Sequence, residues 1–294
     1  MIDLIDFDID LMERMENIRL KAKDDTNAKT FHSGYIWAEP MDIKVHLEND
    51  MYAMKNSSHG ETAWNFPVGE EKAKITFLNE LVRIKGLKLL KLTKDDVEFI
   101  EKHYPDRFII KEAMEDSEYI YDAEEHAKME GKAFASLRRT MNKFNREHTV
   151  KTVMLTEDNM PTAKEVMKAW GEGHEGRGEL DTSGTEIDGF LTEHYEELRM
   201  FGTLTYINDV PSAVVMGYRI TDDVCDIAET KYMPGIRSLG YVAVEEFMRT
   251  FGDKYRYFNN EEDMGIEGLR EYKHCLKPCR IVTLYNAYLK GEGK

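Results

Sequence analysis

The stretch DIAETKYMPGIRSLGYVAVEEF, residues 226–247, carries the clearest sign of the fold because it changes from strand to helix within a few residues. Its side chains alternate up to Tyr232, a Pro-Gly pair makes a turn, and apolar residues recur at helical spacing over residues 238–252. A helix that begins just after a strand presents free N–H groups and the positive end of its dipole, which suit a phosphate or pyrophosphate. Arg237 and Gly240 are therefore candidate donor-binding residues, with a plain strand-to-helix turn as the alternative.

Two charged residues of this strand are candidate site residues. Glu229 and Lys231 share a strand face with Ile227, because side chains two residues apart point to the same side. A carboxylate beside an ammonium can act as a base and as a holder of an anion. The alternative is an exposed ion pair, which contributes little to stability.

Outward from this stretch, the second half of the chain predicts a strand, a helix, a loop, a helix, three strands, a helix, a strand, a short helix and a closing strand. The glycine-rich, polar residues 171–189 form the loop, which is long enough to act as a lid. This order is typical of the N-acyltransferase (GNAT) fold, and the first half repeats it more loosely. We therefore predict an α+β (mixed α/β) protein of two tandem GNAT-like domains, 1–148 and 149–294. Each is expected to be a mixed, mostly antiparallel sheet flanked by helices.

Two segments of the first half illustrate how its elements are assigned. KDDVEFIEKHY, residues 94–104, predicts a helix with Thr93 as its N-cap. GYIWAEPMDIKVHLEND, residues 34–50, predicts strands broken by turn residues.

Composition excludes several classes of protein. The 294 residues carry a formal net charge of −16, whereas a protein that mainly grips a nucleic-acid backbone is usually basic, so no DNA partner is expected. Three cysteines argue against a disulfide framework and predict a cytoplasmic protein. No signal peptide, uncharged apolar run of about 18 residues, HExxH motif or second cysteine pair occurs, so we expect no membrane insertion and no metal site.

One basic island interrupts this acidic chain. Residues 128–151 hold seven lysines and arginines against two glutamates. Within its predicted helix, Arg138 and Asn142 share a face at the i, i+4 spacing, and Lys132 lies just before it. These three are candidate donor-binding residues, with the solvated back of a surface helix as the alternative.

The stretch FNNEEDMGIEGLREYK, residues 258–273, is a third candidate because it begins where a strand ends. Its two glycines permit a tight turn. Arg270 and Lys273 share a helix face at i, i+3 and can clamp a phosphate or carboxylate. The polar residues before them, whose acids can bind an amine, are Asn259, Glu261 and Asp263. The alternative is a solvated loop that leads into a surface helix.

Two motifs of this chain resemble the phosphatidylglycerol lysyltransferase C-terminal-like family, in its uncharacterised soluble branch. They are YIYDAEEHAKMEGKAFASLRRTMNKFNRE (119–147) and NNEEDMGIEGLREYKHCLKP (259–278), and IAETKY resembles a third element. The resemblance covers roughly residues 31–290 and implies a tandem GNAT fold with a cleft where its halves join. Characterised relatives transfer an amino acid from aminoacyl-tRNA to a lipid or another amine. This chain departs from the family pattern at Ala133, Thr230 and Asn260, each of which stands where the family has a cation.

The resemblance implies an acyl- or aminoacyl-transferase that moves an activated acyl group to a small-molecule amine or hydroxyl. We expect Glu229, and after it Glu261, to take the proton of the acceptor. The donor would be acyl-coenzyme A or aminoacyl-tRNA, with tRNA disfavoured by the net charge and no covalently bound cofactor. A non-catalytic protein that binds a small metabolite on a GNAT scaffold is the alternative. The donor-binding candidates are Lys132, Arg138, Asn142, Lys231, Arg237, Gly240, Asn259, Asp263, Arg270 and Lys273.

Overall fold

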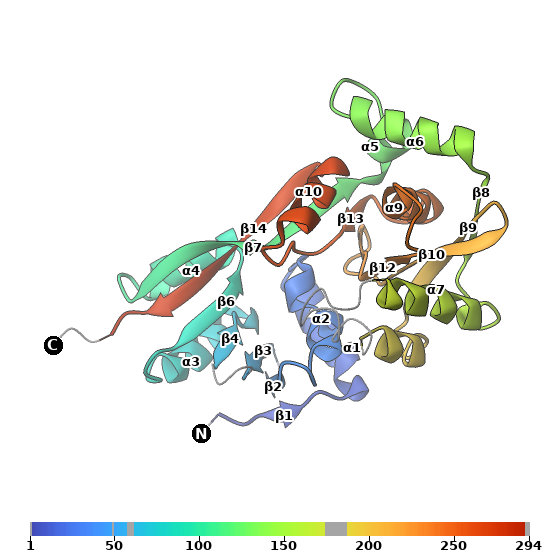
Figure 1. Cartoon of the computed structure of the whole chain (residues 1–294). Coiled ribbons are helices and arrows are strands. Elements are labelled where there is room, and N and C mark those ends of the chain that lie inside the picture. Colours follow the sequence, from blue (N-terminus) through green and yellow to red (C-terminus); the bar gives the residue numbers. More distant parts are fainter. Residues whose placement is uncertain (1, 49, 58–61, 174–186, 292–294) are drawn as a thin grey trace. The chain divides into compact units, whose positions relative to one another are not determined.

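The computed structural model describes residues 2–48, 50–57, 62–173 and 187–291 (Figure 1). Most of the glycine-rich stretch that predicts a lid lies outside these residues. The chain divides into two compact units. Unit 1 comprises residues 1–118, 262–266 and 281–294, and unit 2 comprises residues 119–261 and 267–280.

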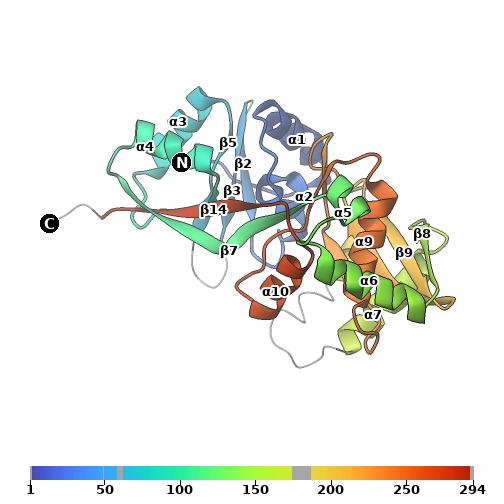
Figure 2. The same ribbon diagram turned by 90° about the horizontal axis from the view of Figure 1, so that it is seen from above.

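Unit 1 is built on one sheet with the strand order β1-β2-β3-β4-β6-β14-β7, in which β5 pairs with β3. Strands β4 and β6 are parallel, whereas β1–β2, β2–β3 and β6–β14 are antiparallel. Figure 2 shows α3 and α4 on the same side of β7 and β14. The elements of unit 1 are β1 (Ile5–Asp6), η1 (Ile9–Leu11), α1 (Met12–Lys21), η2 (Asn27–Lys29), α2 (Phe31–Ile36), β2 (Lys44–Leu47), β3 (Met51–Asn56), β4 (Ala63–Asn65), β5 (Val68–Gly69), α3 (Glu71–Leu81), β6 (Lys88–Leu92), α4 (Lys94–His103), most of β7 (Phe108–Asp122) and β14 (Arg280–Leu289).

The core of unit 1 joins α3 and α4 to the sheet through buried apolar side chains, among them Trp64, Phe77 and Leu78. The N-cap of α4 is confirmed. The Thr93 hydroxyl accepts from the Asp96 N–H, and the Asp96 carboxylate accepts from the Thr93 N–H, which is a capping box. The strand predicted to include residues 34–36 is wrong there, because these residues form the end of α2. The Thr30 hydroxyl caps that helix, and burial of Phe31 fixes it to the core.

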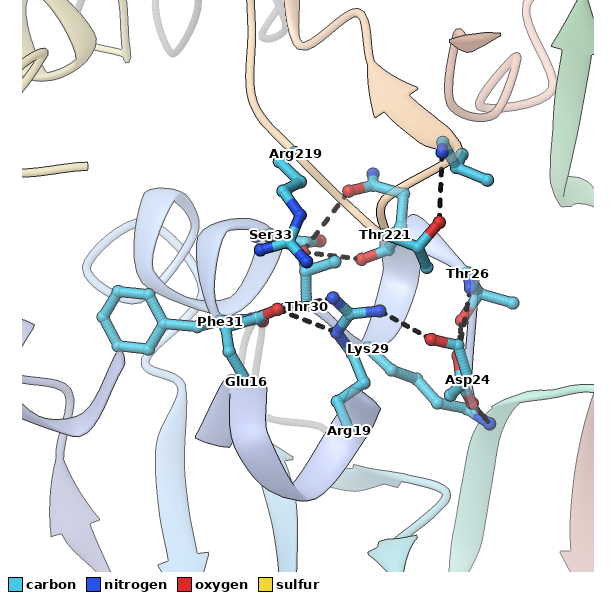
Figure 3. Close-up of polar contacts among 12 residues, drawn as sticks. Glu16, Arg19, Asp24, Thr26, Lys29, Thr30, Phe31, Ser33, Arg219 and Thr221 are labelled. Carbon is cyan, nitrogen blue, oxygen red and sulfur yellow. Dashed lines mark hydrogen bonds and ion pairs between the residues drawn. The ribbon is translucent and has the colours of Figure 1, made fainter. Parts of the chain in front are cut away.

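A buried charged network ties the segment after α1 to α4. Lys29, which is 1 % exposed, places its Nζ 2.9 Å from Asp24 Oδ2 and also pairs with Asp96. Arg19 donates to Glu16 Oε2 through Nε at 3.0 Å and to the Asp24 carbonyl at 2.6 Å (Figure 3). These contacts hold an irregular loop rigidly inside unit 1 because each buried charge has its partner.

Unit 2 holds a second, antiparallel sheet with the order β12-β10-β9-β8. Helix α9 packs against β9, β10 and β12, and α7 packs against β10 and β12. The end of β7 pairs with β13, which is parallel to β11. The elements of unit 2 are α5 (Ala123–Lys128), α6 (Ala135–Glu147), β8 (Val150–Met154), α7 (Met160–Glu172), β9 (Phe201–Ile207), β10 (Val210–Gly217), β11 (Val224–Asp226), β12 (Glu229–Tyr232), α9 (Leu239–Phe251), β13 (Tyr257–Asn259) and α10 (Glu267–Cys275).

Within unit 2, two parallel strands separate at their carboxyl ends. Strands β11 and β13 stay in register up to the pair Asp226 and Asn259, and the Ile227 N–H donates to the Asn259 carbonyl at 2.7 Å. From Glu229 onward the chain pairs with β10 instead, as β12. Side chains at the carboxyl end of β11 and β13 therefore border a place where the sheet opens.

The predicted mixed α+β architecture of sheets and helices is confirmed. The two units differ from the predicted division at residue 148. Residues 119–148 belong to unit 2, and the chain returns to unit 1 at 262–266 and again from 281. The physical reason is that β14 takes its place between β6 and β7, so unit 1 depends on residues from both ends of the sequence.

Candidate active site

A buried charged cluster in unit 2 surrounds the ammonium group of Lys231. Its Nζ lies 3.2 Å from Glu229 Oε1 and 3.5 Å from Asp188 Oδ1. The same nitrogen lies 3.9 Å from the centroid of the Trp170 ring, a cation–π contact. The side chains of Lys231, Asp188 and Glu229 are 6 %, 8 % and 16 % exposed, so this is not the exposed ion pair that the sequence left open.

Three elements of unit 2 assemble this cluster. Glu229 and Lys231 stand on β12, on one face as their spacing predicts. Asp188 comes from a helical stretch at 187–193, and Trp170 from the last turn of α7. Since Glu229 begins β12 shortly after the last pair of β11 and β13, the cluster lies close to where the sheet opens.

Burial changes the acidity of the cluster. Desolvation, together with the charge of Glu229, raises the pKa of Asp188 to about 8, against the lowering effect of Lys231. Burial by itself would lower the pKa of Lys231, but Glu229 and Asp188 outweigh it and the pKa is raised. Lys231 is therefore a permanent cation, whereas Asp188 titrates near neutral pH. Strongly shifted groups of this kind gather at functional sites.

The end of β13 forms a second polar group in unit 2. Asn259 is fully buried, and its side-chain oxygen accepts from the Glu261 N–H at 2.9 Å. The ammonium of Lys273, from α10, is 4 % exposed and donates to the Asn260 carbonyl. Asn259 and Lys273 thus direct these groups to backbone atoms of Glu261 and Asn260 respectively.

The other two candidates in this stretch take separate places. Asp263 is fully buried, and its carboxylate accepts from the Gly265 N–H at 2.9 Å, which closes the turn before α10. Gly265 has a φ of +72° there, a conformation that favours glycine. Arg270 stands on α10 and is half-buried.

The N-terminus of α9 is surrounded by aromatic rings. A Cβ on Gly240 would come within 2.8 Å of the Tyr232 ring, and the Gly240 carbonyl accepts from the Tyr272 hydroxyl at 3.1 Å. Tyr272 also stacks on Tyr241 with ring centroids 4.9 Å apart. Close packing against Tyr232 therefore explains the glycine without any phosphate. Arg237, which precedes the N-terminus of α9, is exposed.

The basic island lies partly along a cavity of unit 2. Lys132 is exposed in the turn before α6, and Arg138 donates to the carbonyls of Met129 and Gly131. Residues of α5, α6 and α9, including Arg138 and Asn142, line a cavity of about 770 Å³. Arg138 and Asn142 therefore line the same cavity, whereas Lys132 is not among its lining residues.

This cavity also has a wall that the sequence analysis missed. His126 Nδ1 lies 2.8 Å from Glu245 Oε1, and both side chains are buried. Burial raises the pKa of Glu245, against the lowering effect of His126. The pair joins α5 to α9, so it fixes two walls of the cavity.

Four side chains of these sites escaped sequence analysis because their partners are distant in the chain. Asp188 meets Glu229 and Lys231 only in the folded unit, and nothing in its own neighbourhood marks it. The others are Trp170, His126 and Glu245. Within the described ranges, no group of three His, Cys, Asp or Glu side chains is placed as a metal site requires, and no helix has the length and apolarity of a membrane span.

Comparison with known proteins places this geometry in context. The family model described as phosphatidylglycerol lysyltransferase, C-terminal, matches residues 22–288. No curated protein matches the chain. A conserved protein of unknown function from Bacteroides thetaiotaomicron is similar, with a TM-score of 0.90, 22% identity and coverage of 99% of this chain and 100% of that one.

Two further solved structures share the fold at lower similarity. The L-PGS of Bacillus licheniformis has a TM-score of 0.62 and 14% identity, with 89% of this chain and 92% of that one covered. The C-terminal domain of a putative lysylphosphatidylglycerol synthetase from Agrobacterium fabrum has a TM-score of 0.63 and 13% identity, with 96% and 92% covered. At these identities the likeness concerns the fold alone.

Proposed function

The chain belongs to the phosphatidylglycerol lysyltransferase C-terminal family, and from this we propose that it transfers an aminoacyl or acyl group to an amine or hydroxyl acceptor. The buried Glu229–Lys231 pair at the opening of the sheet carries the proposal, since it offers a carboxylate at the end of two parting strands. The proposed fold is a tandem of GNAT-like units. The sheet and the flanking helices of each unit support it.

Glu229 is the proposed base, with Glu261 as the second choice. The nitrogen or oxygen of the acceptor attacks the carbonyl carbon of the donor, a bond to that carbon forms, and the bond to the leaving oxygen or sulfur breaks. Glu229 takes the proton that the acceptor loses, and the leaving group takes up a proton in turn. Lys231 keeps Glu229 ionised because an ammonium 3.2 Å away favours the carboxylate.

We propose an aminoacyl ester of tRNA as the donor, with acyl-coenzyme A as the second candidate. Arg139, Lys143 and Arg146 are exposed on α6 at the i, i+4, i+7 spacing and so form one basic stripe, which suits a phosphate backbone. The aromatic side chains around Gly240 argue against a pyrophosphate at the start of α9. In choosing the donor, we therefore give the local basic stripe on α6 more weight than the negative net charge of the chain.

The test of the reaction is a transfer assay with labelled lysyl-tRNA and a panel of acceptors, including amines and vesicles that contain phosphatidylglycerol. The wild type is expected to form a labelled product. Glu229→Gln should lower kcat by about 10²–10⁴-fold in protein whose folded state is checked by circular dichroism, because general-base catalysis contributes on that scale. Glu165→Gln, on the exposed side of α7, is the matched control. Full activity of Glu229→Gln would exclude this base, and ligand binding without turnover would favour the metabolite-binding alternative.

The donor is tested by tRNA binding at rising salt. Affinity should fall steeply between 50 and 200 mM salt, as expected when several phosphates are contacted. Arg139→Glu/Lys143→Glu/Arg146→Glu should bind at least tenfold more weakly, whereas Lys164→Glu/Lys168→Glu on α7 should bind as the wild type does. Stabilisation by coenzyme A thioesters together with equal tRNA binding by both variants would favour acyl-coenzyme A.

A further inference from the structure

The cluster around Lys231 has one carboxylate more than it has cations. Both Glu229 and Asp188 lie within 3.5 Å of the one ammonium group, and all three side chains are largely buried. Two ionised carboxylates in such a place repel each other and lose their hydration. The arrangement is therefore most stable with a single proton between the two acids.

The hydrogen bonds decide which acid holds that proton. Glu229 Oε1 receives the Lys231 ammonium at 3.2 Å and the Thr230 N–H at 2.9 Å. Asp188 Oδ1 is buried, has only the longer 3.5 Å contact with Lys231, and has no hydrogen-bond partner among the described residues. Two donors stabilise the charge on Glu229, so the proton belongs to Asp188.

We propose that Asp188 is a positioning residue that carries the shared proton and thereby keeps Glu229 ionised beside Lys231, ready to accept a proton from the acceptor. This inference rests on the proposed function for its catalytic meaning, but the protonation of Asp188 is a property of the folded chain alone. The pKa of about 8 that burial and Glu229 impose on Asp188 agrees with it.

Among the described residues, the charged groups that act on Asp188 come from β12. They are Glu229, which raises its pKa, and Lys231, which lowers it, while α7 contributes the uncharged ring of Trp170 beside Lys231. A carboxyl whose pKa is raised on folding binds more protons in the folded than in the unfolded chain. Its contribution to stability is therefore present below the unfolded pKa of about 3.8 and is lost progressively up to about pH 8.

The experiment compares melting temperatures of the wild type and Asp188→Asn from pH 5 to pH 9. An asparagine cannot ionise, so the melting temperature of the variant relative to the wild type should rise by roughly 3 °C or more between pH 5 and pH 8 and then level off. Asp188→Glu should restore the pH dependence. Parallel curves for the wild type and Asp188→Asn would overturn the proposal.

A second measurement applies even if Asp188→Asn fails to fold. Infrared spectra of the wild type should show a protonated carboxylic acid that ionises near pH 8. In Glu229→Gln that ionisation should move to lower pH, because the repelling charge is gone. An unchanged ionisation in Glu229→Gln, or no protonated acid at pH 7, would overturn the proposal.

Enzyme kinetics distinguish the proposed protonation of Asp188 from the proposed transferase activity. If transfer occurs, ionisation of Asp188 places a second negative charge beside Glu229, so the pH profile of kcat/KM should show an inflection near pH 8 in the wild type that is absent in Asp188→Asn. The melting and infrared results need no substrate, so a chain without transferase activity still tests the protonation of Asp188.

Discussion

Unit 1 and unit 2 each bury a lysine between two aspartates or glutamates, but the two clusters are satisfied differently. In unit 1, Asp24 pairs with Lys29 and also accepts from the N–H and hydroxyl of Thr26, at 3.0 and 2.6 Å (Figure 3). In unit 2, the cation beside Asp188 among the described residues is Lys231, at 3.5 Å, and Glu229 is a second acid beside it. Burial by itself raises the pKa of both carboxyl groups. The pKa of Asp24 is nevertheless lowered, chiefly by Lys29, whereas that of Asp188 is raised to about 8.

The difference shows that burial alone does not decide whether a buried acid stays charged: Lys29 and Thr26 outweigh desolvation at Asp24, whereas desolvation and the charge of Glu229 prevail at Asp188. A carboxylate with a full set of donors holds a loop in place and resists protonation. A carboxylate that lacks donors keeps a proton that it can lose near neutral pH. The first arrangement suits a structural role and the second suits chemistry.

The largest effect is expected from Lys29→Met, which breaks the satisfied cluster. It leaves Asp24 and Asp96 buried without their cation, so unfolding in urea should show a loss of about 4 kcal/mol. Lys29 is the main cause that lowers the pKa of Asp24, so without it the loss should be smaller at pH 5 than at pH 8, because a proton can then neutralise the buried carboxylate. Lys21→Met, which removes an exposed pair with Glu70, should leave the unfolding midpoint unchanged. Equal effects of the two variants would contradict the structural role of Lys29.

A smaller effect is expected from Lys231→Met in the incompletely satisfied cluster. Asp188 already carries a proton there, so only one charge is stranded, and the loss should be about 2 kcal/mol at pH 7. Urea unfolding at pH 7 checks this, and a loss equal to that of Lys29→Met would erase the contrast between the two clusters.

The smallest effect concerns the ring beneath Lys231. Trp170→Leu removes the aromatic face 3.9 Å from the ammonium, whereas Trp170→Phe keeps one. We expect the leucine variant to be less stable than the phenylalanine variant by about 1 kcal/mol, measured by urea unfolding. Indistinguishable stabilities would mean that the ring only fills space.

Local signals predicted local structure well. The helix predicted over residues 238–252 is α9 (Leu239–Phe251), and Thr93 caps α4 as its sequence indicates. These elements depend on spacing and on a hydrogen bond between neighbours, both of which are present in the sequence. The prediction for residues 34–36 was wrong because tertiary burial of α2 outweighed a strand-like composition.

Contacts between distant segments escaped prediction. The face shared by Glu229 and Lys231 follows from strand geometry, but burial and the approach of Asp188 depend on how α7, β12 and the stretch at 187–193 pack. The limits of the two units could not be predicted for the same reason. Nothing in the sequences of β6, β7 and β14 indicates that β14 pairs between the other two strands. The roles of Arg270, Arg237 and Lys132 stay predictions.

The position of β14 also has a consequence for synthesis on the ribosome. Residues 123–279 separate β7 from β14 in the sequence. The strands β6 and β7, which flank β14 in the sheet, therefore leave the ribosome well before β14 does. At about 5–20 residues per second, the wait is on the order of 10–30 s. During that time the nascent chain presents two open strand edges, which are templates for aggregation. Both edges are covered only when β14 pairs between β6 and β7.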